Sequence, residues 1–167
     1  AYRIFNTVLK GNKNDWSALM GIGYVYSQYR SYDKATTNLE ESLRINNQSK
    51  TIKESVYTPG TYGEFWIESN AKSTLAWCYY NKENYDKAIG LFKEVLKKHS
   101  KWIDVYDGLA WSYFRKGDVK SAEVEFNKAL EIDKNYASSV QGFNVVKAGK
   151  NGQYNLALNY YYSGYYD

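Results

Sequence analysis

Two side chains of the sequence have the chemistry of catalytic groups, the thiol of Cys78 and the imidazole of His99. A nucleophilic thiol needs a base beside it that takes its proton, and an imidazole is the commonest such base. The chain has one cysteine and one histidine. Cys78 lies between two aromatic residues in the middle of a predicted helix, and His99 lies in a basic run at a predicted helix end. We therefore interpret Cys78 as a packed residue and His99 as a solvated one, and we expect no enzymatic activity.

Motifs for cofactors and metals are incomplete in this sequence. The glycines of residues 21–23 (GIG) lack the third glycine and the preceding strand of a dinucleotide-binding loop. The GK pair at residues 149–150 is followed by Asn151, where a phosphate-binding loop needs Ser or Thr. Acidic neighbours such as Glu40 and Glu41 are ordinary on helix surfaces, and no metal-ligand spacing is present. The sequence therefore predicts no catalytic residue, no metal site and no cofactor.

The composition also excludes several classes of protein. Of 167 residues, 44% are hydrophobic and 24% charged, with a net charge of +4 and mean hydropathy of −0.66. This mild positive charge is not the footprint of a nucleic-acid-binding surface, and no apolar run approaches the ~18 residues of a membrane span. The first residues lack an initiator Met and a signal-peptide layout, so we expect a piece of a longer protein with any targeting signal outside it.

Alanine recurs at intervals of 34 or 35 residues, at positions 1, 35, 88, 122 and 157, once an insert of 19 residues is removed from the second interval. Such a period indicates a stack of small units, none of which buries its apolar face alone. A stack of this kind usually binds partners along its surface. We therefore expect a groove rather than a catalytic cluster.

The clearest unit spans residues 104–133, and its apolar residues have helical spacing. A break follows at Gly117, and Asp118 is a suitable N-cap for a second helix because its carboxylate can accept from free backbone N–H groups. Two antiparallel helices with a short turn are predicted. Their apolar stripes consist of Tyr106, Leu109, Ala110 and Tyr113 in the first helix, and Ala122, Phe126, Ala129 and Leu130 in the second.

These helix pairs resemble the tetratricopeptide repeat (TPR) family. The family pattern places Leu-Gly or Leu-Ala and a Tyr in helix A, and Tyr, Ala, Phe and Ala in helix B. The residues that carry the resemblance are Tyr106, Leu109, Ala110, Tyr113, Ala122, Phe126 and Ala129; Leu75, Ala76, Tyr79, Tyr85, Ala88 and Phe92; and Ile22, Gly23, Tyr26, Tyr32, Ala35 and Leu39. The resemblance implies an all-α fold, a right-handed α-solenoid of antiparallel helix pairs in a TPR-like superhelix.

The same register predicts how the chain is organised. Residues 1–167 are expected to form a single repeat domain. Its parts are helix B of a truncated repeat (1–10), a repeat (16–46), an insert (47–68), two repeats (69–101 and 103–135) and a divergent or truncated repeat (137–167). For the insert, we weigh a longer helix pair with a protruding loop against a loop that contacts a ligand.

The family binds its ligands along the concave face formed by successive helices A. Carrying its inward-facing positions onto this sequence implies a groove with rows of aromatic and polar side chains. The candidate binding residues are Tyr24, Ser27, Gln28, Trp77, Tyr80, Asn81, Asp107, Trp111, Phe114 and Arg115.

One of these rows consists of Tyr24, Trp77 and Trp111, and this aromatic row has two interpretations. The rings form a binding stripe, because Trp and Tyr dominate interface hot spots, or they pack between repeats and stabilise the stack. The predicted function is a non-enzymatic scaffold that binds a partner protein or peptide segment in the groove. The alternatives are a carbohydrate-contacting or assembly module of a bacterial envelope or polysaccharide export system, and a spacer that self-associates through its exposed ends. Nucleic acid is not an expected partner.

Overall fold

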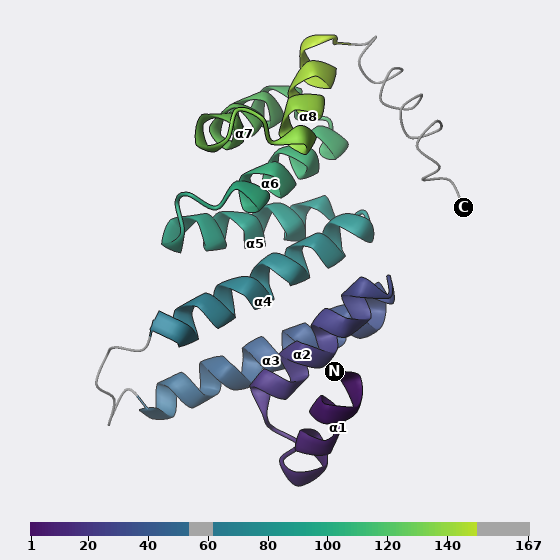
Figure 1. The fold of residues 1–167 in the computed structure, drawn as a ribbon, viewed down its shortest axis with the longest axis vertical. Coiled ribbons are helices and arrows are strands. Elements are labelled where there is room, and N and C mark those ends of the chain that lie inside the picture. Colours follow the sequence, from purple (N-terminus) through teal and green to yellow (C-terminus); the bar gives the residue numbers. More distant parts are fainter. Residues whose placement is uncertain (54–61, 150–167) are drawn as a thin grey trace. The chain divides into compact units, whose positions relative to one another are not determined.

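The computed structural model describes residues 1–53 and 62–149, with side chains described for residues 1–48 and 68–149. Every regular element in these residues is a helix (Figure 1), which confirms the all-α prediction. The helices are α1 (Tyr2–Gly11), α2 (Trp16–Gln28), α3 (Tyr32–Lys53), α4 (Tyr62–Asn81), α5 (Tyr85–Lys98), α6 (Ile103–Lys116), α7 (Val119–Ile132) and α8 (Ala137–Lys147).

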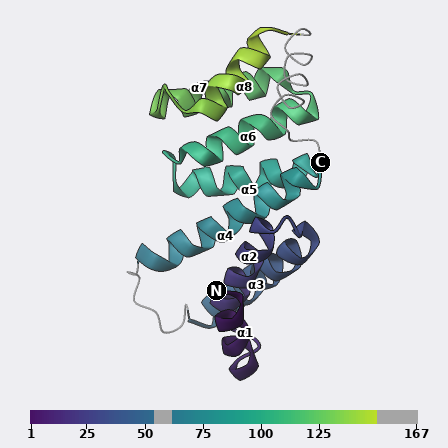
Figure 2. The same ribbon diagram turned by 45° about the vertical axis from the view of Figure 1, so that its right-hand side comes forward.

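The chain divides into two compact units. The first unit comprises residues 1–91 and the second residues 92–167, with the boundary inside α5. In the first unit, α2 packs against α1, α3 and α4, and α3 packs against α4. Figures 1 and 2 both show α2 and α3 side by side. In the second unit, α6 packs against α7, and α8 packs against both. Each unit therefore contains an antiparallel helix pair whose partner helices follow closely in sequence.

Small residues allow the helices of the first unit to approach closely. A Cβ added at Gly23 on α2 would lie 2.6 Å from Cγ of Leu39 and 3.2 Å from the carbonyl oxygen of Ala35, both on α3. The hydroxyl of Ser42 on α3 also donates to the carbonyl oxygen of Trp16 on α2 at 2.6 Å. The core of this unit is built from buried apolar side chains, among them Ala18, Ile22, Ala35, Leu39, Leu75, Ala76 and Ala88.

Local sequence signals set several helix ends. The carboxylate of Asp15 accepts from the backbone N–H of Ala18 at 2.9 Å and begins α2. Asp118 accepts from the N–H of Ser121 at 3.1 Å and begins α7, which confirms its predicted role as an N-cap. Gly117 ends α6 with a φ of 92°, a left-handed conformation that glycine adopts without steric cost.

The segment predicted as an insert, residues 47–68, lies partly within helix. α3 continues to Lys53, and α4 begins at Tyr62. The turn between them and the predicted helix after Gly149, with its tyrosine-rich end, lie outside the described residues. None of the helices in the described part of the chain has both the length and the apolar character needed to cross a lipid bilayer.

Candidate binding surface

In the first unit, α2 presents three of the predicted binding residues. The side chain of Tyr24 is 53% exposed, and that of Gln28, one turn later, is also exposed. Ser27 is half-buried, and its hydroxyl donates to the carbonyl oxygen of Tyr24 at 2.6 Å. A large ring and an amide therefore lie on an accessible face of a helix whose buried face is supplied by smaller residues.

Three more of the predicted residues lie near the end of α4, which packs against α2. The rings of Trp77 and Tyr80 are half-buried and meet edge to face, with centroids 5.4 Å apart. The ring of Tyr80 also meets that of Tyr85 on α5 at 5.8 Å. Asn81 is exposed, and its Nδ2 donates to the carbonyl oxygen of Trp77 at 2.8 Å. These contacts fix the arrangement of the rings near the end of α4.

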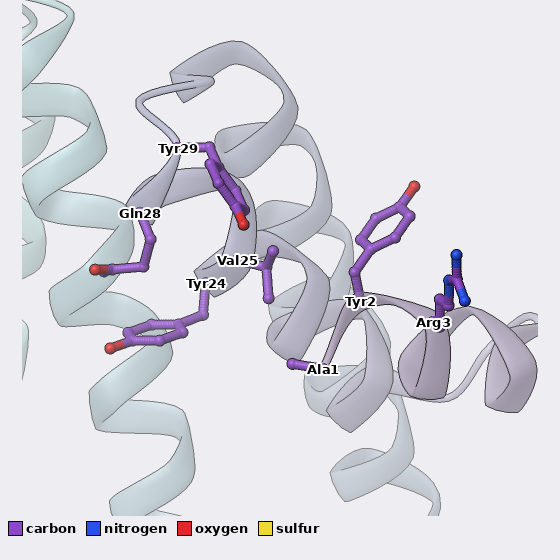
Figure 3. Close-up of a pocket in the computed structure, with 7 residues that line it drawn as sticks. All are labelled: Ala1, Tyr2, Arg3, Tyr24, Val25, Gln28 and Tyr29. Carbon is purple, nitrogen blue, oxygen red and sulfur yellow. The ribbon is translucent and has the colours of Figure 1, made fainter.

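An open pocket of about 420 Å³ lies between the start of α1 and the end of α2. Figure 3 shows Tyr24 and Gln28 pointing to one side of α2, away from Tyr2 and Arg3 on α1. The residues that line it are Ala1, Tyr2, Arg3, Tyr24, Val25, Gln28 and Tyr29. Of these residues, Tyr24 and Gln28 were predicted from the sequence. Ala1, Tyr2 and Arg3 were not, because the repeat register does not place α1 relative to α2. The available signal was the presence of further tyrosines near the repeat positions, Tyr2 and Tyr29.

In the second unit, three predicted binding residues are buried instead. Trp111 is 6% exposed, Phe114 7% and Asp107 3%. The ring of Trp111 meets that of Phe126 on α7 at 5.1 Å, and its Nε1 donates to the hydroxyl of Ser138 on α8 at 3.0 Å. Within this unit, these side chains pack α6 against α7 and α8 and do not line an open surface. Arg115, at the end of α6, is exposed.

The carboxylate of Asp107 is the centre of a polar cluster between α6 and α8. It accepts from the hydroxyls of Ser138 and Ser139, each at 2.7 Å. Burial raises the pKa of Asp107, although both serine hydrogen bonds oppose that effect. One turn earlier, the hydroxyl of Tyr136 donates to Asp104 at 2.6 Å. The cluster pairs the polar groups at this helix contact, which is a structural role.

Charged side chains of the first unit form contacts between α3, α5 and the end of α4. Lys82 pairs with Asp33 at 2.6 Å. The hydroxyl of Tyr79 donates to Glu40 and accepts from Lys87 Nζ at 3.1 Å. By contrast, α2 contains no charged residue. The side chains that α2 exposes are therefore polar or aromatic, and the exposed Arg3 of α1 lines the same pocket as Tyr24 and Gln28.

The two residues considered for catalysis, Cys78 and His99, differ in burial and surroundings. Burial raises the pKa of the Cys78 thiol to about 11, so the thiol is protonated at neutral pH. His99 is half-buried and meets Trp102 edge to face at 5.8 Å. Within the described residues, no group of three or more His, Cys, Asp or Glu side chains is arranged to hold a metal ion.

Comparisons with known proteins agree with this architecture. The family model described as tetratricopeptide repeat matches residues 69–102 and 103–136, which confirms the resemblance seen in the sequence. No curated protein matches the chain.

The solved structures that match are similar in fold. MamA (residues 41 to the end) from Desulfovibrio magneticus RS-1 is 14% identical, with a TM-score of 0.73 over 95% of this chain and 79% of that one. Another crystal structure of MamA is 18% identical, with a TM-score of 0.71 over 95% and 81%. RapI in its apo form is 18% identical, with a TM-score of 0.67 over 98% of this chain and 46% of that one.

Proposed function

We propose that this chain, whose residues 69–102 and 103–136 match the tetratricopeptide repeat model, is a non-enzymatic scaffold whose partner protein lies on the face formed by α2 and α4. The observation that carries this proposal is the exposure of Tyr24, which is 53% on a helix already packed through Ala18, Ile22 and Gly23. An exposed tyrosine offers large contact area at a low cost in side-chain entropy. Tyr24 is therefore the primary contact residue.

Trp77 and Tyr80 extend this contact onto α4. Trp and Tyr are enriched among the few residues that dominate binding energy, and they act best where the surrounding contacts exclude water. The two rings contact each other at 5.4 Å, so a partner meets them in an arrangement that already exists. Ser27, Gln28 and Asn81 supply polar groups beside the rings.

In this proposal, the predicted residues of the second unit have different roles. Trp111, Phe114 and Asp107 act by keeping α6, α7 and α8 together, because their side chains are buried. Arg115 remains a candidate contact of the second unit by virtue of its exposure.

A pull-down with the 167-residue chain, followed by mass spectrometry, tests the proposal. We expect proteins that are recovered with the wild type and lost with Tyr24→Ala, with a decrease in binding of roughly 2 kcal/mol for a hot-spot residue. Val124→Ala on α7 is the matched control, because Val124 is 51% exposed. Partners that bind both variants equally well would place the interaction on another surface.

A further inference from the structure

We infer that the exposed apolar face of α1 is the binding site of a further α-helix, the first helix of a repeat in which α1 is the second. The face consists of Ala1, which precedes α1, and of Ile4 and Val8, and we call it the open face of α1. The covering helix precedes Ala1 in the polypeptide and lies antiparallel to α1. The contact is built from α1 itself, so its test is separate from that of the partner surface proposed on α2 and α4.

α1 has apolar side chains on two sides, and its contact with α2 uses one of them. The ring of Phe5 lies against Gly21 of α2. On the other side, Ile4 is 67% exposed and Val8 is 40% exposed, and α1 contains no buried residue. Because Ile4 and Val8 are four positions apart, they share one face of the helix. Such an apolar face is normally buried against another element.

The equivalent residues of α3 are buried against the helix that precedes it, α2. A Cβ added at Gly23 of α2 would lie 2.6 Å from Cγ of Leu39 and 3.2 Å from the carbonyl oxygen of Ala35. The hydroxyl of Ser42 donates to the carbonyl oxygen of Trp16 on α2. The 34-residue period relates Ala1 to Ala35, Phe5 to Leu39 and Val8 to Ser42. These three residues of α3 are 0% exposed, so a first helix covers on α3 the face that is open on α1.

The second unit contains the same arrangement. α7 packs against α6, and the ring of Phe126 on α7 meets that of Trp111 on α6 at 5.1 Å. The equivalents of Ala1, Phe5 and Val8, 121 residues later, are Ala122, Phe126 and Ala129, and all three are 0% exposed. In both units, therefore, a helix with this pattern of residues has the preceding helix packed against it.

The residue at position 4 makes the open face of α1 more apolar than its equivalents. Asn38 on α3 and Glu125 on α7 correspond to Ile4, and both are half-buried polar residues. α1 instead exposes an isoleucine at this position. Burial of Ile4 and Val8 under an apolar helix would remove this surface from water, which favours the contact.

The chemistry of the covering helix follows from the helices that cover α3 and α7. α2 has Gly23 where it approaches α3, and the equivalent residue of α6 is Ala110, which is 0% exposed. We therefore expect an amphipathic helix with Gly or Ala at this point, because a larger side chain would hold the two helices apart. The α1 helix of a second copy does not meet this requirement, because its own open face presents Ile4 and Val8.

The experiment joins a copy of residues 15–34 to the front of Ala1. The copy contains Asp15, the N-cap of α2, and all of α2, and its last residue is followed by Ala1 as Lys34 is followed by Ala35 in the chain. Hydrogen–deuterium exchange of the backbone amides of α1 is then compared with and without the extension. We expect exchange to become slower by about tenfold or more, because local opening of α1 then requires separation of a second helix contact.

Two substitutions are the controls. A copy that carries Gly23→Leu has the same length and a higher helix propensity, but its leucine prevents the close approach, so we expect no slowing. Val8→Lys should change the exchange of α1 little in the 167-residue chain, where Val8 is exposed, and should remove most of the slowing in the extended chain.

Slower exchange that depends on both Gly23 of the copy and Val8 supports the inference. Unchanged exchange, or equal slowing by the two copies, overturns it. Sedimentation of the 167-residue chain tests a second copy as the occupant: we expect a monomer, and a dimer that Val8→Lys dissociates would overturn the inference. A pull-down partner that is lost with Val8→Lys and retained with Tyr24→Ala would show that another protein covers this face, which also overturns it.

Discussion

The ring of Phe5 on α1 lies so close to Gly21 on α2 that a Cβ added at position 21 would overlap the ring. The ring of Phe126 on α7 has the same relationship to Gly142 on α8. Both pairs are separated by 16 residues in the sequence. The same contact therefore recurs in the two units, each time between a ring on one helix and a glycine on a helix packed against it.

This relationship predicts that Gly142→Ala destabilises the protein. The added methyl group has to displace the buried ring of Phe126, and overpacking of this kind costs about 1–3 kcal/mol. Urea unfolding followed by circular dichroism measures the loss. Gly90→Ala on α5 is the matched control, because its Cβ would meet nothing within 4 Å. Because Gly90 lies in a helix interior, Gly90→Ala should raise the free energy of unfolding by about 0.5–1 kcal/mol. Equal effects of the two substitutions would contradict the close approach.

The different burial of Trp111 and Tyr24 predicts opposite behaviour on truncation. Trp111→Ala removes a buried ring and its hydrogen bond to Ser138, so we expect a loss of about 3–5 kcal/mol in unfolding free energy. Tyr24→Ala removes an exposed ring, so we expect a change within about 0.5 kcal/mol. Chemical denaturation of both variants measures this contrast. If Trp111→Ala leaves the free energy of unfolding unchanged, Trp111 does not hold these helices together and is again a candidate binding residue.

The raised pKa of Asp107 predicts that its contribution to the free energy of unfolding decreases as pH rises. Its pKa is raised in the folded state from the ordinary value of 3.8, so the folded protein holds this proton more tightly than the unfolded chain does. The stabilisation is fully present below the unfolded value and is lost as pH rises through the folded value. Relative to Asp107→Asn, the wild type should therefore lose unfolding free energy across this range. Paired urea titrations from acid to neutral pH measure the difference, and a pH-independent difference would show that Asp107 does not titrate as described.

The burial of Cys78 predicts that its thiol is unreactive until the protein unfolds. Burial covers the sulfur and raises its pKa to about 11, so the thiolate population at neutral pH is very small. Ellman's reagent should react slowly with the native protein and rapidly in urea. Rapid reaction of the native protein would indicate that α4 exposes this position.

The helix pairs could be predicted from the sequence because they depend on the spacing of small and apolar residues and on N-cap residues. The spacing of small and apolar residues places Gly23 against Leu39, and the carboxylate of Asp118 begins α7 as expected. Such features depend on residues that are close in sequence or related by the repeat. The candidate binding residues were chosen by the same register, which treated Tyr24, Trp77 and Trp111 as equivalent.

The sequence by itself determined that the chain folds as paired helices, because small residues recur at equivalent positions of the repeat, and Ala35, Ala88 and Ala122 are completely buried there. The tertiary structure decided which rings of the row are accessible. Trp111 is covered because Ser138 and Phe126, from other helices, lie against it, whereas Tyr24 remains exposed. Periodicity shows which side of a helix a residue occupies. Whether another helix covers that side depends on contacts between distant parts of the chain, which periodicity does not contain.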